Sequence, residues 1–145
     1  MTNNNALDVA KFIINYCNEN GKPVNILKLN KMLYFMWADY YRDTGLQLFS
    51  DNFYAWRYGP VVPCVYFEFN YNSAGPISRI FKHGVSPVLQ SRISKYIEKY
   101  IDESTFNLIE KSMMPGRAWD TVYKNKTNKE EVIPCKLIIR LDCNN

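Results

Sequence analysis

The stretch that decides the fold is ILKLNKMLYFMWADYYRDT, residues 26–44. Its apolar residues recur at the three- and four-residue spacing of an amphipathic helix. The main stripe consists of Leu29, Leu33, Met36, Trp37 and Tyr40, with Met32 and Phe35 beside it. Asn25 is a suitable N-cap, and Gly45 is a suitable stop. The pattern predicts a long helix at the centre of the fold.

Further helices are predicted on both sides of this stretch. Residues 6–20 carry a broad apolar arc that ends at Asn20-Gly21. Later helices are expected after Pro60–Pro63, from Ser86-Pro87, after Asp102 or Ser104 as cap, around Trp119 (118–123), and from Pro134. The helix capped by Asp102 or Ser104 would carry Phe106, Ile109 and Met113.

Two segments resemble strands instead. Residues 53–58 alternate in character and are rich in aromatics, and residues 77–81 are a candidate partner strand. Residues 70–76 and 124–131 read as loops. The sequence therefore predicts a mostly α fold with a minor β-hairpin. We expect one compact domain over residues 1–145, with about six to seven helices and a small two-stranded sheet.

The composition is that of an ordinary globular chain, except for its high content of aromatic residues. Of the 145 residues, 47% are hydrophobic and 22% charged, but 15% are aromatic. Large rings close small cores and also anchor binding surfaces; their helical phase favours the core here. A net charge of +4, spread without runs, permits nucleic-acid binding but does not indicate it. No C-x-x-C pair, leader or membrane-length apolar run is apparent, so a reduced, cytoplasmic protein is expected.

The residues of common catalytic sites are missing. His83 is the single histidine, which removes most metal-ligand sets and leaves one candidate base for a nucleophilic site. Its position in a loop favours simple exposure. The glycines form no phosphate-binding motif. Acidic pairs such as Asp102-Glu103 are placed to complement a helix dipole. We therefore expect no catalytic, cofactor or metal site, and no enzyme.

Three stretches carry a family resemblance. They are DVAKFII (8–14), LKLNKMLYF (27–35) and FYAWRYGPVVPCVY (53–66). In this order and spacing they resemble the Panacea family of SocA-like and phage-associated GepA-like proteins. Trp119, after the break at Pro115, falls where the family places a late tryptophan. The family's histidine before that tryptophan is replaced here by Ser112-Met113-Met114, so no role of that histidine transfers to this chain.

The resemblance implies an antitoxin from a prophage or other mobile element that neutralises a cognate toxin by protein–protein contact. A second reading is an adaptor that delivers its toxin to a ClpXP-type protease. A third is a DNA-binding autoregulator of its own operon, ranked last because no basic recognition helix is evident.

Six residues of the shared motifs are candidates for partner contact: Lys28, Lys31, Tyr34, Trp56, Arg57 and Tyr58. In the alternative reading, the aliphatic stems of the two lysines cover the edge of the core while their ammonium groups reach water, or the lysines pair with internal acids. Two interpretations of Tyr34 are open: a core ring with a bonded hydroxyl, or an interface residue. Trp56 is expected to fill the core, and Arg57, on the opposite strand face, to meet a partner. The sheet edge here could also accept a partner strand.

Overall fold

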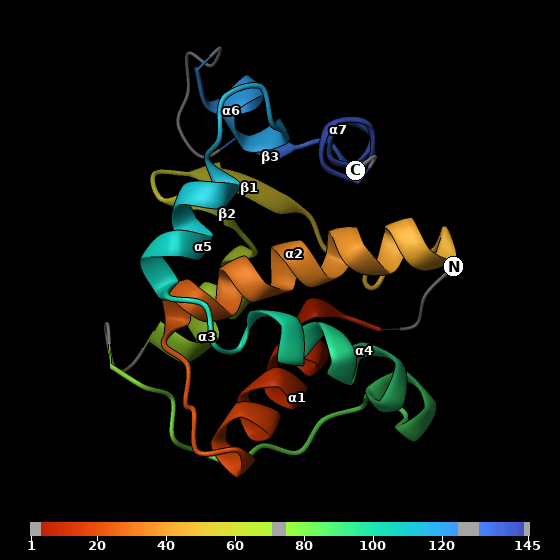
Figure 1. Ribbon diagram of the computed structural model, residues 1–145, viewed down its shortest axis with the longest axis vertical. Helices are drawn as coiled ribbons and strands as arrows, with labels where there is room; N and C mark the ends of the chain where they lie inside the picture. The colour runs from red at the N-terminus through yellow and green to blue at the C-terminus, as the bar shows by residue number, and fades with distance from the viewer. Residues whose placement is uncertain (1–3, 71–74, 125–130, 144–145) are drawn as a thin grey trace.

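The central helix organises the molecule (Figure 1). The computed structural model describes residues 4–70, 75–124 and 131–143. Its helices are α1 (Ala6–Glu19), α2 (Ile26–Thr44), α3 (Pro63–Phe69), α4 (Pro87–Tyr100), α5 (Thr105–Ser112), α6 (Ala118–Lys124) and α7 (Cys135–Asp142). Its strands are β1 (Phe53–Trp56), β2 (Gly59–Val61) and β3 (Val132–Ile133). These seven helices and three strands within the described ranges confirm the mostly α prediction.

Helix α2 begins and ends where its capping residues predict. The side chain of Asn25 accepts a hydrogen bond of 2.8 Å from the backbone N–H of Lys28. At the other end Gly45 is left-handed, with φ of 73°, and its N–H donates to the Tyr41 carbonyl at 2.7 Å. These bonds satisfy backbone groups that have no partner inside the helix.

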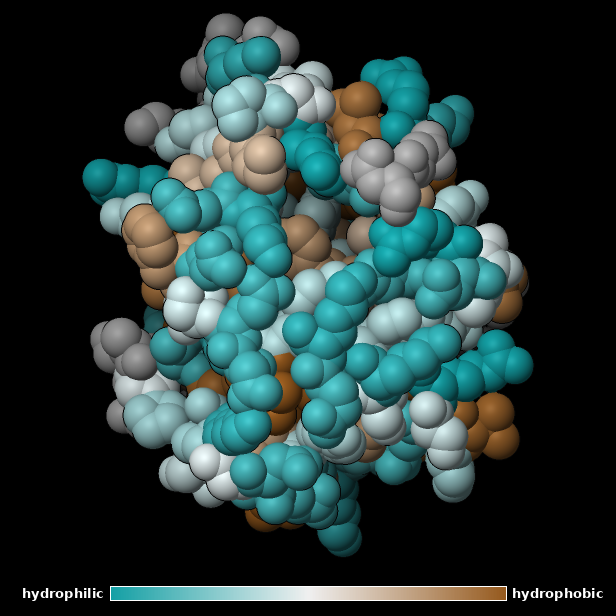
Figure 2. Space-filling model, viewed as in Figure 1, coloured by the Kyte–Doolittle hydropathy of each residue, from teal (hydrophilic) through white to brown (hydrophobic). Residues whose placement is uncertain are grey.

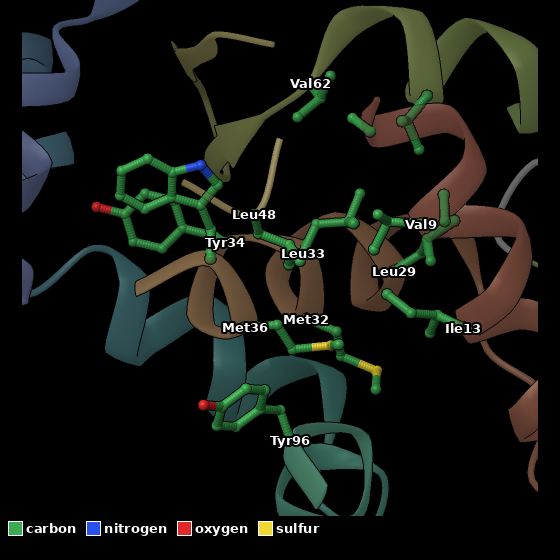
Figure 3. Close-up of a cluster of buried hydrophobic side chains, with 14 of the residues drawn as sticks. Val9, Ile13, Leu29, Met32, Leu33, Tyr34, Met36, Leu48, Val62 and Tyr96 are labelled. Carbon is green, nitrogen blue, oxygen red and sulfur yellow. The ribbon is translucent and has the colours of Figure 1, made fainter. Parts of the chain in front are cut away.

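The core surrounds α2 on several sides. Figure 3 shows Leu29, Met32, Leu33 and Met36 pointing from α2 toward residues of other elements. These neighbours are Val9 and Ile13 of α1, Tyr96 of α4, and Leu48 and Val62 of the connecting segments. All five are buried. Helix α2 thus contacts α1, α4, α5 and strand β2 of the hairpin.

Serine caps fix two of the later helices. Ser86 accepts from the Leu89 N–H at 3.2 Å, with Pro87 in the first turn. Ser104, and not Asp102, caps α5, accepting from the Asn107 N–H at 3.0 Å. Within the described ranges, no helix has both the length and the apolarity needed to cross a membrane.

The sheet differs from the prediction. It has three antiparallel strands in the order β2-β1-β3. Strand β1 ends at Trp56, and its hairpin partner is the three-residue strand immediately after the turn, with Ala55 opposite Pro60. On the other side Phe53 pairs with Ile133. The expected two-stranded sheet of residues 53–58 and 77–81 is therefore wrong.

Residues 77–81 lie along α1 as an extended segment outside the sheet. The Asn15 side chain donates to the Phe81 carbonyl at 2.8 Å and accepts from the Phe81 N–H at 2.9 Å. Asn18 donates to the Ile77 carbonyl at 3.0 Å. Helix side chains thus supply bonds that a strand partner would otherwise make. The predicted loops contain residues 71–74 and 125–130, which lie outside the described residues.

Candidate partner-binding surface

A turn between β1 and β2 presents two motif residues to solvent. Arg57 and Tyr58 are both exposed, Tyr58 by 51%. The Arg57 guanidinium carbon lies 5.4 Å from the centre of the Tyr58 ring, within the range of a cation–π contact. Arg57 was expected on the strand face opposite Trp56, but the strand ends at Trp56. The turn therefore holds both side chains at its tip.

A groove of about 630 Å³ lies between this turn and α5. Tyr58, Phe106, Ile109, Met113 and Met114 supply its apolar lining, and Glu110 and Lys111 contribute polar groups. Phe106 is 69% exposed and Met114 47%. Hydrophobic atoms are visible at the left edge of Figure 2, on the side where α5 lies. An exposed apolar patch with a polar border is typical of a macromolecular interface, and methionine adapts its shape to the surface it meets.

The groove arises from the way α5 faces the core. Leu108 and Ser112 are its buried residues, whereas Phe106 points outward. The expectation that most rings fill the core therefore fails at Phe106. The apolar residues of α5 fall on two faces, a signal of a second, outward-facing surface that the sequence already contained.

A second aromatic group begins at Trp56, the residue immediately before the turn. The Trp56 ring makes edge contacts with Tyr66 at 5.2 Å and Phe67 at 6.0 Å between centroids. Phe67 is 70% exposed, and Trp56 is half-buried rather than in the core as predicted. The enclosed indole N–H of Trp56 has no hydrogen-bond partner among the described residues. We call the turn (Arg57 and Tyr58), the groove and the Trp56–Tyr66–Phe67 group together the hairpin surface.

The two lysines of α2 differ in how deeply they are buried. Lys28 is half-buried and donates to the Ile101 carbonyl at 2.6 Å, and burial lowers the pKa of its amine. Lys31 is completely buried and donates to the Pro60 carbonyl at 3.0 Å. Desolvation lowers the Lys31 pKa to about 7. Both side-chain nitrogens donate to backbone carbonyls, neither forms an ion pair with an acid among the described residues, and Lys31 is not on the surface.

Tyr34 is a core ring with a bonded hydroxyl. It is almost fully buried, and its hydroxyl donates to the Asp142 carboxylate. The other oxygen of Asp142 accepts from the Ala118 N–H at 3.2 Å. Burial, with the Asp142 charge, raises the Tyr34 pKa well above its usual range. Tyr34 thus joins α2 to α6 and α7 and is enclosed beneath the surface.

A second pocket, of about 250 Å³, lies beside Tyr34, and its lining includes the charged residues Asp39, Arg42 and Asp142. Asp39 accepts from Arg42 at 2.5 Å, from the Tyr100 hydroxyl at 2.5 Å and from Lys99 at 3.3 Å. Figure 2 shows a hollow near the middle of the face, bordered by hydrophilic side chains. The buried carboxylates of this pocket already accept several hydrogen bonds, so these acids connect neighbouring helices of the fold.

His83 is likewise engaged in structure. It is half-buried rather than freely exposed: its Nδ1 accepts from the Val85 N–H at 3.2 Å, and its ring contacts Phe12 edge-on. Over residues 4–70, 75–124 and 131–143, no group of three or more His, Cys, Asp or Glu residues is arranged to hold a metal ion.

These features describe a mostly helical protein with an exposed apolar surface suited to binding another macromolecule. The family model described as "Antitoxin SocA-like, Panacea domain" matches residues 29–120, more than half of the chain. The chain belongs to this SocA-like Panacea antitoxin family, which confirms the resemblance carried by the three motif stretches.

A curated relative agrees with the family match. Antitoxin SocA of Caulobacter vibrioides (strain NA1000 / CB15N) is 33% identical over 115 residues, covering 69% of this chain. The aligned region is 60% of the relative's own length, so the chain spans only part of that protein. No solved structure matches significantly.

Proposed function

We propose that this protein is an antitoxin that neutralises a cognate toxin by direct, non-catalytic contact, and that the toxin binds the hairpin surface. Family membership supports the class of function. The observation that carries the location is the apolar groove between Tyr58 and α5, where large side chains remain exposed.

The surface has the composition of an interface centre. Aromatic residues, methionine and arginine are enriched where protein partners bury one another, and the turn and groove offer all three types. The matching partner surface is an apolar segment of the toxin that fills the groove and covers Tyr58. The polar groups beside the groove, Glu110 and Lys111, would then fix its orientation.

Non-catalytic action fits the chemistry of the described residues. The buried acids Asp39 and Asp142 each accept hydrogen bonds from neighbouring groups, and His83 accepts from a backbone N–H. All three groups are bonded within the fold, which supports a structural role for each of them.

Co-expression tests the function. The product of the neighbouring reading frame is expressed alone and together with this chain, and growth and co-purification are measured. We expect growth arrest by the neighbour alone, rescue by this chain, and a stable complex. A harmless neighbour, or rescue without a complex, would overturn the proposal.

Matched variants test the location. We expect Tyr58→Ala and Phe106→Ala each to weaken toxin binding by at least about tenfold, the effect of removing an interface anchor. Val88→Ala is the control, since Val88 is 70% exposed but lies outside the groove. Equal effects of all three variants would contradict this placement.

A protease deletion separates direct neutralisation from delivery. If direct contact suffices, rescue and toxin level are unchanged in cells that lack the ClpXP-type protease. Toxin that accumulates and arrests growth in those cells would show the adaptor mechanism and refute direct neutralisation.

A further inference from the structure

Strand β2 is an edge strand, yet its outer edge is bonded. In the order β2-β1-β3, one side of β2 has no neighbouring strand. The N–H of Ala55, opposite Pro60, donates to Glu131 on the β3 side of β1. Because opposite residues of an antiparallel ladder alternate between bonding each other and facing outward, the Pro60 carbonyl points away from β1. It points to α2.

Two consecutive polar residues of α2 bond this edge. Lys31 Nζ donates to the Pro60 carbonyl at 3.0 Å, and Asn30 Oδ1 accepts from the Val62 N–H at 3.0 Å. Asn30 and Lys31 are both buried, at 1% and 0% exposure. One side chain donates and the next accepts, as the backbone of an added strand would do.

The lysine stem also fits closely against the turn. A Cβ on Gly59 would lie 2.7 Å from Lys31 Cε and 2.5 Å from Ser112 Oγ. The backbone at Gly59 therefore packs directly against both α2 and α5. Gly59 follows Tyr58, and Ser112 ends the helix that forms the other wall of the groove.

Burying an amine without a carboxylate is expensive, so packing alone does not account for Lys31. Among the described residues its one hydrogen-bond acceptor is the Pro60 carbonyl, and no acid within them forms an ion pair with it. An apolar residue would fill the volume but leave an enclosed carbonyl unbonded.

We propose that Asn30 and Lys31 are positioning residues that replace a missing strand at the edge of β2 and thereby hold Arg57 and Tyr58 in the geometry that binds the toxin. The edge-closing half stands on the hydrogen bonds alone; the binding half rests on the proposed function. The same bonds occupy backbone groups of Pro60 and Val62 that an added partner strand would need.

Amide exchange tests the edge without any toxin. In Lys31→Met we expect the amides of Gly59, Val61 and Val62, which the ladder and Asn30 protect, to exchange about tenfold faster or more, as loss of one hydrogen bond would give. The α1 amides of Ile13 and Ile14 should be unchanged. Met36→Leu is the control, a buried α2 substitution. Unchanged exchange of Gly59, Val61 and Val62 in Lys31→Met would overturn the edge-closing role.

A double-mutant cycle tests the binding half, with the neighbouring reading frame's product as the probe. We expect Lys31→Met to weaken its affinity about tenfold, and the double variant with Tyr58→Ala to be little weaker than Tyr58→Ala alone. Additive effects would show that Lys31 does not act through Tyr58. If Tyr58→Ala binds like the wild type, the proposed surface is wrong, while the exchange result still decides the edge.

The wild-type chain provides a further measurement should Lys31→Met fail to fold. With ¹⁵N-labelled lysine, we expect one amine whose protons exchange slowly because they are enclosed and bonded to Pro60. Uniformly fast exchange of every lysine amine would refute the contact.

Discussion

The indole nitrogen of Trp119 donates a 2.7 Å hydrogen bond to the backbone carbonyl of Trp56, across 63 positions of sequence. This bond joins α6 to the end of β1, immediately before the turn that carries Arg57 and Tyr58. The Trp119 ring also stacks on Tyr123, with centroids 4.4 Å apart. The late tryptophan of the family motif therefore ties the C-terminal part of the fold to the hairpin surface.

Trp119→Phe should lower the free energy of unfolding by about 1–3 kcal/mol. The phenyl ring keeps an aromatic face toward Tyr123 but leaves the Trp56 carbonyl without this donor. Denaturant unfolding measures the change. Phe106→Leu is the comparison: its exposed side chain predicts a change within about 0.5 kcal/mol. Equal stability of Trp119→Phe and wild type would contradict a structural role for the bond.

Tyr34→Phe should be destabilising by about 1.5–3 kcal/mol, because it removes a hydroxyl bonded to the buried Asp142 carboxylate. The two groups form one unit, so the double variant Tyr34→Phe/Asp142→Asn should lose less than the sum of the single losses. Thermal or denaturant unfolding of the four proteins gives the coupling. Additive losses would show that the contact contributes no stability.

The sequence predicts those parts of the fold that depend on local chemistry. Asn25, Ser86 and Ser104 cap their helices because a short oxygen-bearing side chain can reach the first free N–H groups. Segment 77–81 was misassigned because the groups that satisfy it, Asn15 and Asn18, lie on a distant helix. Strand pairing has no local signal of this kind.

The candidate site was predictable in part for the same reason. The turn residues Arg57 and Tyr58 are exposed, as a partner contact requires, and their motif stood out in the sequence. Lys31 could not be placed, because its acceptor is a backbone carbonyl 29 positions away that carries no sequence signature. The outward face of α5 was overlooked because apolar spacing indicates a packed face without saying whether the same chain covers it.

Gly59→Ala should be destabilising by more than Gly116→Ala. Both glycines have positive φ, 105° and 83°, so each substitution strains the backbone, at about 1 kcal/mol or more. At Gly116 nothing lies within 4 Å of the added Cβ, whereas at Gly59 it meets Ser112 Oγ at 2.5 Å and Lys31 Cε at 2.7 Å. The difference between the two losses in unfolding free energy measures the close packing around Gly59. Equal losses would contradict it.

Lys31 should make stability depend on pH in a particular direction. Desolvation lowers its folded pKa to about 7, whereas an unfolded lysine titrates near about 10.4. Between these values the unfolded chain binds a proton that the folded chain does not, so stability rises with pH, by at most about 1.4 kcal/mol per pH unit. Below about pH 7 Lys31 is protonated in both the folded and the unfolded chain, and the stability that the neutral amine contributes at high pH is fully lost.

The comparison with Lys31→Met isolates this contribution. Burial raises the pKa of the Cys17 and Cys143 thiols to about 11, so above about pH 8.5 they lower stability as pH rises, in variant and wild type alike. The wild-type minus variant difference in unfolding free energy should therefore increase from pH 7 to 10 and be flat from pH 5 to 6.5. Denaturant titrations across this range measure it. A difference that is flat from pH 7 to 10 would mean that Lys31 is not desolvated, and that the edge of β2 is open to water.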